Sequence, residues 1–477
     1  MKRSSGVLCP VFSLPGAYSI GSFGAPAFRF IDRLAEGGFS WWQVLPLGVC
    51  DEWNSPYKSP SAFSLNPWFI DLPTLFSDGL ITEEELIAAQ EKYPYLCEYD
   101  RLRAERMPLL FRAAARLGDP APVHAFLAAH PQTAEFCRFM ALKEQNAGKD
   151  WQEFCNPDPD EEIVFGWAFT QYEAYRQWQA VRAYARERGI GIIGDIPIYV
   201  AEQSSDVCFH REEFLLGADG RARFIAGVPP DYFSAEGQVW GNPLYNWPHA
   251  RRNGYAFFRA RLSWALELFD GMRLDHFRGF ESYFRIAASA ATAREGKWVR
   301  GPGNSFLRAI SDLTSRALVI AEDLGEITPA VEELVRKSGF PAMRVLQFGF
   351  LGDAHSPHLP HNYPENCVAY TGTHDNNTLL GYLFEMPAGE RRWLMRYCGA
   401  SEENWVESSP AVLRTLLASH AGLAILPIQD IFGFGADTRI NTPGVAEGNW
   451  AYRMTDGQLD MADFGRFLTL NHLYGRA

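Results

Sequence analysis

Eight short, almost continuously apolar runs are the feature of this sequence that most restricts its fold. Near-continuous apolar character without strict alternation is typical of strands buried on both faces of a sheet. The runs cover residues 6–14, 41–48, 189–200, 271–277, 317–325, 342–350, 366–377 and 421–432.

Helical patterns lie between these runs. The pattern at 328–339 offers Thr328 as an N-cap, Pro329 at the first helical position and acidic residues in the first turn. Strands that alternate with helices predict a mostly parallel sheet, and eight repeats predict an α/β fold of the closed (β/α)8 or TIM barrel type. The other helical patterns cover residues 26–38, 171–189, 257–269 and 304–317.

The uneven spacing of the runs predicts two insertions in a single catalytic barrel over residues 1–477. After predicted strand 2, residues 73–165 carry helical patterns, so we expect a mostly helical insertion. After predicted strand 3, residues 201–256 include a hairpin pattern at 214–227 with Ala-Asp-Gly at the turn. Because barrel active sites lie where such loops emerge, we expect 201–256 to wall the active-site cleft. No sandwich-like module follows the eighth run, so we expect no C-terminal β-sandwich domain.

Charge and composition exclude several classes of partner. The formal net charge is −13 and no long basic run occurs, which argues against nucleic acid and anionic membranes. The eight cysteines form no CxxC pair and are typical of reduced thiols. The first apolar run is interrupted by Pro10 and Pro15, which makes a poor signal peptide, and no stretch approaches the ~20 apolar residues of a membrane helix. We expect a soluble, cytoplasmic protein.

Charged side chains sit at the ends of several predicted strands, where a parallel barrel has its catalytic mouth. A lone strand-end aspartate most often caps a helix or pairs on a loop, but three strand ends that carry acids beside Arg, His or Asn favour a catalytic site. The residues concerned are Asp195, Arg273, Asp275, His276, Glu322, Asp323, His374 and Asp375.

Convergent carboxylates beside an arginine suit glycosidic-bond chemistry. A retaining enzyme needs a nucleophilic carboxylate and a carboxylic acid ~5–5.5 Å apart, and adjacent strands lie ~4.8 Å apart. Because side chains alternate along a strand, Arg273 and Asp275 share a face, and the arginine would hold that carboxylate ionised. A less polar environment would raise the pKa of the acid, and a third acid could grip sugar hydroxyls more tightly in the transition state.

Competing motifs are weaker. The GxGxxG pattern at 189–194 lies within an apolar run, whereas a dinucleotide loop needs these glycines to follow a strand and open a helix. Three histidines in 355–361 are interrupted by Pro357 and Pro360 and lack nearby ligands at zinc spacing, so an exposed loop is expected there. No GxSxG-type elbow supports acyl chemistry.

An ordered series of longer motifs covers nearly the whole chain. In this order and spacing they resemble the 4-α-glucanotransferases (amylomaltases or disproportionating enzymes) of glycoside hydrolase family 77, which are related to the α-amylase clan. The motif at 227–247 is the most diagnostic, because ordinary α-amylases do not carry it. The motifs cover residues 12–24, 54–72, 194–208, 227–247, 272–280, 320–325, 370–378 and 441–450.

The resemblance implies Asp275 as nucleophile, Glu322 as acid/base and Asp375 as the acid that stabilises the transition state. It implies transfer of a 1,4-α-glucan segment to the 4-hydroxyl of glucose or another glucan by a retaining double displacement, with no cofactor or metal. Its substrates would be maltooligosaccharides, amylose and glucans derived from starch or glycogen. The implied substrate-binding residues are Arg273, His374, Tyr57, Asp195, Gln238, Trp240, Ser55 and Asn441.

Two other functions remain open from the sequence. One is an α-glucan hydrolase of the same clan, against which the 227–247 motif argues. The other is a glycan-binding barrel without activity, against which the three convergent acids argue. Transfer requires that an acceptor sugar meet the glycosyl-enzyme before water does, and we expect Trp240, Tyr245, Trp247 and the loop 233–238 to bind the acceptor.

Overall fold

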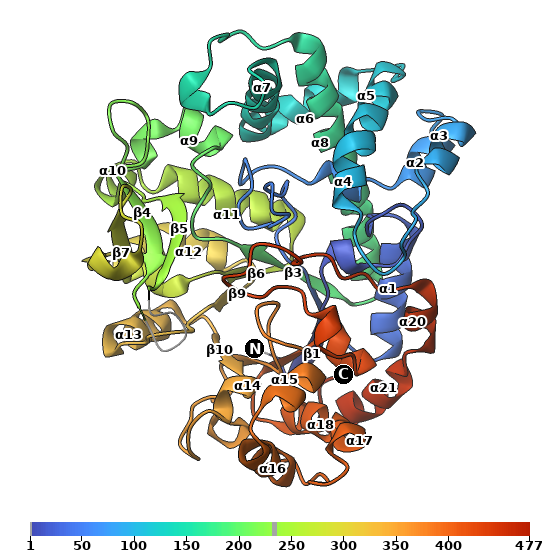
Figure 1. The fold of residues 1–477 in the computed structure, drawn as a ribbon, viewed down its shortest axis with the longest axis vertical. Helices are drawn as coiled ribbons and strands as arrows, with labels where there is room; N and C mark the ends of the chain where they lie inside the picture. The colour runs from blue at the N-terminus through green and yellow to red at the C-terminus, as the bar shows by residue number, and fades with distance from the viewer. Residues whose placement is uncertain (1, 231–235) are drawn as a thin grey trace.

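A closed barrel of parallel strands forms the centre of the computed structural model, which describes residues 2–230 and 236–477 (Figure 1). The strands follow each other around the barrel in chain order, and each overlaps one of the eight apolar runs, so the predicted (β/α)8 barrel is confirmed. They are β1 (Ser4–Leu8), β2 (Trp41–Gln43), β3 (Gly191–Ile196), β6 (Gly271–Leu274), β9 (Leu318–Ala321), β10 (Ala342–Val345), β11 (Cys367–Tyr370) and β12 (Leu423–Pro427).

Helices surround the barrel at the predicted places. Pro329 occupies the first position of its helix as expected, but the Thr328 side chain makes no capping hydrogen bond. The five predicted helices are α1 (Ala25–Glu36), α8 (Glu161–Glu187), α11 (Ala256–Leu268), α12 (Asn304–Thr314) and α13 (Pro329–Ser338). After β10 come α14 (Leu346–Gly349), α15 (Leu379–Glu385), α16 (Ala388–Tyr397), α17 (Trp405–Ser408), α18 (Pro410–Ala418), α19 (Ile428–Phe432), α20 (Asp456–Met461) and α21 (Phe464–Leu473).

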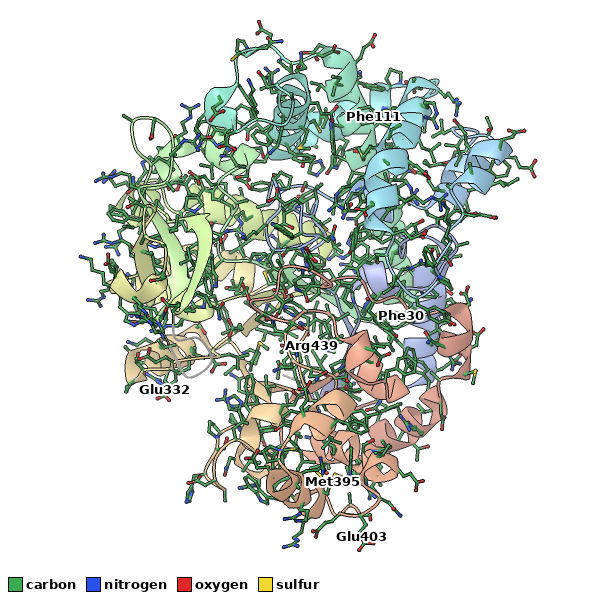
Figure 2. All side chains as sticks on the ribbon, viewed as in Figure 1. Phe30, Phe111, Glu332, Met395, Glu403 and Arg439 are labelled. Atoms are coloured by element: carbon green, nitrogen blue, oxygen red, sulfur yellow. The ribbon has the colours of Figure 1, made fainter. Side chains whose placement is uncertain are left out.

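A group of helices between β2 and β3 stands away from the barrel, where Phe111 is labelled in Figure 2. The long helix α8 joins both parts. Trp167 in its first half packs with Phe136 in a small separate core, while Trp178 further along contacts Trp42 of β2. The group contains α2 (Leu72–Ser77), α3 (Glu83–Ala88), α4 (Tyr99–Arg101), α5 (Met107–Ala115), α6 (Ala121–Ala129), α7 (Pro131–Gln145) and α8.

A four-stranded antiparallel sheet lies beside the barrel, with α9 (Ser205–Phe209) and α10 (Trp247–Arg252) nearby (Figure 1). An antiparallel bridge joins Leu216 and Ala222 at the predicted hairpin, but the following strand pairs elsewhere. Two of the strands come after β6, beyond the expected insertion, and no sequence pattern predicted them. The strand order is β5 (Gln238–Pro243), β4 (Phe224–Val228), β7 (Ser282–Ala287) and β8 (Lys297–Arg300).

Close packing accounts for the GxGxxG pattern. Gly191 and Gly194 both lie inside β3, not in a loop. A Cβ atom at Gly194 would come within 2.2 Å of the ring of Phe269, and one at Gly191 within 2.5 Å of the ring of Trp41. Because these glycines have no side chain, aromatic rings can pack directly against the backbone of β3. Over the described residues, no helix combines the length and the apolar character that a membrane span requires.

A fully buried arginine fastens the end of the chain to the bottom of the barrel. The Arg476 guanidinium donates to the carbonyl oxygens of Ser4 (2.8 Å), Leu417 (2.6 Å), Ser419 (3.1 Å) and Ala421 (3.0 Å). Ser4 begins β1, and the other three carbonyls precede β12, its neighbour in the barrel. One side chain therefore joins the first and last strands where the barrel closes.

Arg476→Ala should lower the free energy of unfolding by about 3 kcal/mol, because four carbonyl oxygens each lose a hydrogen bond from a buried guanidinium. Urea unfolding followed by tryptophan fluorescence measures this loss. The matched control is Arg414→Ala, which removes an exposed arginine that donates to the Tyr474 hydroxyl, and its expected loss is below about 0.5 kcal/mol. Equal losses in the two variants would contradict a special role for Arg476.

Candidate active site

Arg273 is the central cation of the catalytic mouth. It is the register partner of Asp195 on the neighbouring strand, and its Nη1 donates to Asp195 Oδ1 and Oδ2 (2.8 and 2.7 Å). Its Nη2 lies 2.9 Å from Asp275 Oδ1, two residues further along. Burial acts to lower the pKa of Arg273, but the two carboxylates outweigh it and hold this pKa well above its ordinary value. The shared face predicted for Arg273 and Asp275 is thus observed.

Asp275 and Glu322 follow adjacent strands at the same level of the barrel. Leu274 of β6 is the register partner of Ala321 of β9, and the next residues along the two strands are these two acids. Backbone hydrogen bonds continue the pairing beyond the strands, from Glu322 N–H to the Leu274 carbonyl (3.1 Å) and from Phe277 N–H to the Glu322 carbonyl (3.0 Å).

Glu322 has surroundings unlike those of Asp275. Its side chain accepts hydrogen bonds from the backbone N–H groups of His276 (2.7 Å, to Oε2) and Leu324 (2.7 Å, to Oε1), and the residue is only 8 % exposed. Burial, assisted by the negative charge of Asp275, raises the pKa of Glu322 to about 7 against the opposing effect of Arg273. A carboxyl group with this pKa can hold a proton and release it near neutral pH.

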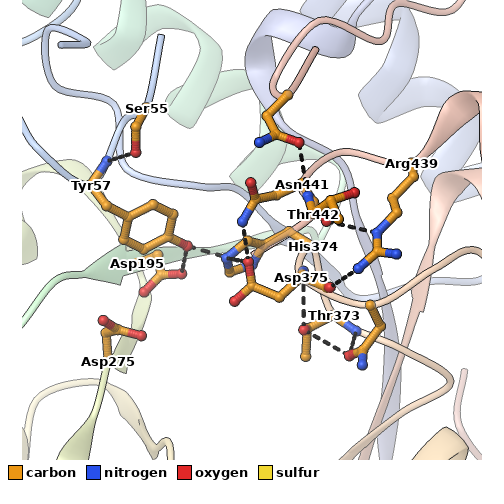
Figure 3. Close-up of polar contacts among 12 residues, drawn as sticks. Ser55, Tyr57, Asp195, Asp275, Thr373, His374, Asp375, Arg439, Asn441 and Thr442 are labelled. Atoms are coloured by element: carbon orange, nitrogen blue, oxygen red, sulfur yellow. Dashed lines mark hydrogen bonds and ion pairs between the residues drawn. The ribbon is translucent and has the colours of Figure 1, made fainter. Parts of the chain in front are cut away.

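Asp375 is held at the end of β11 by its neighbours and by a distant segment. Its Oδ1 accepts a hydrogen bond from Asn441 Nδ2 (2.6 Å) and lies 3.3 Å from His374 Nε2 (Figure 3). The Asn441 N–H donates to the His374 carbonyl (3.1 Å). Arg439 donates from Nη2 to the Asp375 carbonyl (2.7 Å) and from Nε to the Asn441 carbonyl (2.8 Å). These contacts fix both the backbone and the carboxylate of Asp375.

Tyr57 connects the Asp195 side of the site to the Asp375 side. Its hydroxyl donates to Asp195 Oδ2 (2.8 Å), and its ring stacks on His374 with centroids 5.1 Å apart. The ring of Trp450 packs against both, with centroids 5.8 Å from Tyr57 and 5.9 Å from His374. Ser55 accepts a hydrogen bond from the Tyr57 N–H (3.3 Å), and Figure 3 shows it above this tyrosine. The structure therefore places Ser55 next to the site through Tyr57.

Gln238 and Trp240 approach from the small sheet. They share one face of β5, and Trp240 Nε1 donates to Gln238 Oε1 (3.1 Å). The Trp240 ring meets the His276 ring edge to face, with centroids 4.9 Å apart. His276 follows Asp275 directly and has a left-handed backbone (φ 48°). Burial lowers the pKa of the His276 ring to about 4, so the imidazole is neutral near pH 7.

Two of the residues proposed as an acceptor surface are instead part of the core. Tyr245 and Trp247 are only 2 % and 7 % exposed, and both pack against Phe258. The interpretation that they contact an acceptor is therefore wrong, since a sugar needs an accessible ring. Of the acceptor loop 233–238, residues 233–235 lie outside the described part of the chain.

Some charged residues near the site face elsewhere. Asp323 accepts the N–H of Met343 (2.7 Å) and pairs with Arg344 (3.2 Å), so it supports β10. Arg278 lies over the Trp298 ring at 3.6 Å and donates to the Glu326 carbonyl, which joins β8 to the segment after Glu322.

Arg439 and Trp450 were not among the site residues predicted from the sequence. Arg439 lies near the centre of the molecule in Figure 2. Trp450 lies within the motif at 441–450, which was the one sequence signal that could have identified it. Its left-handed backbone (φ 64°) cannot be read from the sequence.

The histidine-rich segment 355–361 serves local structure. His358 Nδ1 accepts the N–H of Val345 (3.1 Å), and His361 forms a hydrogen bond with the Tyr397 hydroxyl (2.8 Å). Across residues 2–230 and 236–477, no three His, Cys, Asp or Glu side chains gather in a way that could hold a metal ion.

A (β/α)8 barrel with two carboxylates on adjacent strand ends, one paired with arginine and one with a raised pKa, is typical of retaining enzymes that act on glycosidic bonds. The model of the family described as 4-alpha-glucanotransferase, glycoside hydrolase family 77, matches residues 9–460. The chain belongs to this family, and the resemblance stated from its motifs is confirmed.

Individual relatives agree with this assignment over full length. The chain is 42 % identical to a 4-alpha-glucanotransferase of Thermus thermophilus, with 96 % of each chain covered. It is 40 % identical to one of Synechocystis sp., covering 100 % of this chain and 98 % of the relative. Among solved structures, amylomaltase from Streptococcus agalactiae in complex with acarbose superposes with a TM-score of 0.95 at 34 % identity, covering 100 % of both chains.

Asp275→Asn should lower the pKa of Glu322 from its value of about 7, because it removes a nearby negative charge that favours the protonated acid. Infrared difference spectra of the carboxyl band, recorded against pH, measure this change. Asp323→Asn is the matched control, since Asp323 pairs with Arg344 and should leave the pKa of Glu322 in place. An unchanged or higher pKa in Asp275→Asn would contradict the coupling.

Proposed function

We propose that this chain transfers 1,4-α-glucan segments to the 4-hydroxyl of glucose or of another 1,4-α-glucan by a retaining double displacement. The observation that carries the proposal is that the two carboxyl groups at the ends of β6 and β9 have different electrostatic surroundings. Asp275 pairs with the Arg273 guanidinium (2.9 Å), while burial raises the pKa of Glu322 to about 7. A nucleophile and a proton donor are therefore available together near neutral pH.

In the first half-reaction, an Asp275 oxygen attacks the anomeric carbon of the donor sugar while Glu322 gives its proton to the departing glycosidic oxygen. The bond from that carbon to the leaving sugar breaks, and an ester between the glucosyl unit and Asp275 forms. Both oxygens of Glu322 accept a backbone N–H, and each keeps a second lone pair that can carry the proton. Arg273 remains paired with Asp195 throughout, so a positive charge stays beside the nucleophile.

In the second half-reaction, the Glu322 carboxylate takes the proton of an acceptor 4-hydroxyl as that oxygen attacks the anomeric carbon. The ester breaks, Asp275 is released, and two inversions leave the α configuration unchanged. Each turnover exchanges one glycosidic bond for another. The number of reducing ends therefore stays constant in transfer and rises only in hydrolysis.

We assign Asp375 to the sugar hydroxyls of the donor unit. Asn441 and His374 hold its carboxylate in place, so its hydrogen bonds can strengthen as the ring flattens toward an oxocarbenium ion. Arg273, Asp195, Tyr57 and His374 form one connected group beside it and are proposed to surround the donor sugar, with Ser55 and Asn441 as neighbouring binding residues.

We propose that the acceptor binds on the small-sheet side, against Trp240 and Gln238. Trp240 is partly exposed and contacts the residue that follows Asp275, so a sugar stacked on it would lie next to the glycosyl-enzyme. The segment 201–256 would then wall the cleft, with 73–165 as a helical insertion of the same single barrel over 1–477.

The substrates we propose are maltooligosaccharides, amylose and α-glucans from starch or glycogen, in line with the family and with the acarbose complex of the S. agalactiae relative. All eight cysteines are free thiols, which fits a reducing compartment such as the cytoplasm.

Purified protein given maltotriose should produce glucose and a ladder of longer maltooligosaccharides, with no rise in total reducing ends. Asp275→Asn and Glu322→Gln should each reduce this turnover by at least about a thousandfold, since each removes one partner of the double displacement. Product chromatography with a reducing-end assay measures both.

Three outcomes distinguish the proposed transferase from its alternatives. Reducing ends that rise with every bond broken would indicate a hydrolase. Glucan binding without turnover by the wild type would indicate a glycan-binding barrel. Full activity in Asp275→Asn would remove this residue from the nucleophile role.

Trp240→Ala should lower the ratio of transfer to hydrolysis on maltotriose by about tenfold, because water replaces a stacked acceptor sugar. Val239→Ala is the matched control: Val239 is its neighbour on β5, is 40 % exposed and faces the other side of the strand. A ratio unchanged in Trp240→Ala would place the acceptor elsewhere.

A further inference from the structure

A buried aspartate behind the catalytic mouth has contacts that the chemistry above does not use. Asp430 lies in α19, directly after β12, and is 5 % exposed. Its Oδ2 accepts a hydrogen bond from the Thr371 hydroxyl (2.5 Å), and its Oδ1 accepts the N–H of Leu379 (2.7 Å). One carboxylate thus binds both ends of a nine-residue segment, 371–379, that contains His374 and Asp375.

This segment has little regular structure of its own. It begins after β11 and ends as α15 begins, so its path between Thr371 and Leu379 depends on side-chain contacts. Gln347 lies in α14, directly after β10, and adds one such contact. Its Nε2 donates to the Asn377 carbonyl (2.8 Å). Gln347 also donates its own N–H to the Thr371 carbonyl (3.3 Å), but Asp430 binds both end residues, Thr371 and Leu379, through a single carboxylate.

The residue before Asp430 acts on the second segment that reaches Asp375. Gln429 is 3 % exposed, and its Nε2 donates to the Thr438 carbonyl (3.1 Å). Thr438 precedes Arg439, which donates to the Asp375 carbonyl, and the same segment contains Asn441, which donates to the Asp375 carboxylate. Two consecutive residues of α19 therefore anchor both chain segments that position Asp375.

We propose that Asp430 is a positioning residue of the transfer reaction that, together with Gln429, holds the Asp375 carboxylate where the donor sugar requires it. This inference rests on the proposed role of Asp375. Asp430 is buried behind the segment that it holds, so its effect on the reaction passes through the geometry of 371–379. A displacement of about 1 Å at a group that acts in the transition state can cost on the order of a hundredfold in rate.

The local electrostatics agree with a dedicated anchor. Burial raises the pKa of Asp430 to about 6, and its hydrogen bonds with Thr371 and Leu379 act in the opposite direction. Desolvating a carboxyl group is unfavourable, so these two contacts offset part of the cost that burial imposes. An apolar side chain at this position would avoid the cost but would leave the Leu379 N–H without its acceptor.

The variants separate the contacts of Asp430 from its bulk. Asp430→Ala removes both contacts and should lower kcat on maltotriose by about 10–100-fold, with KM changed by less than about threefold. Asp430→Asn should recover most of the rate, because its amide oxygen can accept the Leu379 N–H and its NH2 group can donate to the Thr371 hydroxyl. Thr371→Val removes one donor alone and should give an intermediate loss, which keeps the inference testable if Asp430→Ala folds poorly.

Asp71→Ala is the matched control for the loss of a buried carboxylate. Asp71 is also 5 % exposed, and it accepts hydrogen bonds from the Ser22 hydroxyl (2.9 Å) and from the Thr74 N–H (3.1 Å) at the start of α2. Its removal should lower the melting temperature but leave kcat within about twofold of the wild type, measured well below that temperature.

A double-mutant cycle tests whether Asp430 acts through Asp375. In an Asp375→Asn background, Asp430→Ala should cost less than about threefold in kcat, because there is no carboxylate left to position. Residual rates of the Asp375→Asn variants are measured at high enzyme concentration.

Three outcomes would overturn the inference, and they identify what failed. If Asp430→Ala keeps kcat within about twofold while Asp375→Asn is inactive, Asp430 does not position the site although the proposed function stands. If Asp430→Ala costs the same factor with and without the Asp375 carboxylate, its role is general stability. If Asp375→Asn keeps the wild-type kcat, the proposed role of Asp375 fails, and the positioning role fails with it.

Discussion

The ion pair between Arg273 and Asp195 is the interaction on which the rest of the catalytic mouth depends. Both side chains are buried, at 6 % and 0 % exposure, and a buried arginine is tolerated only when its donors are occupied. Because the two residues are register partners on β3 and β6, the pair also fixes the alignment of these strands. The Nη2 group of the same arginine reaches Asp275, so the proposed nucleophile directly follows the strand that carries its counter-ion.

This arrangement gives two similar carboxyl groups different surroundings. Asp275 has a permanent cation beside it, whereas Glu322 is bound by two uncharged backbone donors in a buried position. One donor is the N–H of His276, whose left-handed backbone turns the chain directly after Asp275. A single turn therefore positions the hydrogen bond to Glu322, while the His276 ring contacts Trp240, which we propose to bind the acceptor.

The barrel and the candidate catalytic acids can be predicted from the sequence because both leave local signals. The barrel appears as eight apolar runs, and the acids appear as charges within or after these runs. Asp275 and Glu322 are charges at the ends of apolar runs, and the topology of a parallel barrel brings such ends together. Contacts between distant segments leave no such local signal: Arg439 lies 64 residues from Asp375, and β7 pairs with a strand that precedes β6. The exposure of a side chain cannot be read from the local sequence either. Tyr245 and Trp247 are residue types that often bind sugars, but here they are buried in the core.

The eighth strand links the closure of the barrel to the reaction. β12 pairs with β1 on one side and β11 on the other, so it both completes the barrel and lies beside the strand that leads to Asp375. Arg476 fastens the beginning of β12, and Gln429 and Asp430 extend from its other end to the segments that hold Asp375. This strand therefore connects the closure of the barrel to the segments that hold Asp375. The contacts that surround Asp375 thus extend, through β12, to the residues that close the barrel.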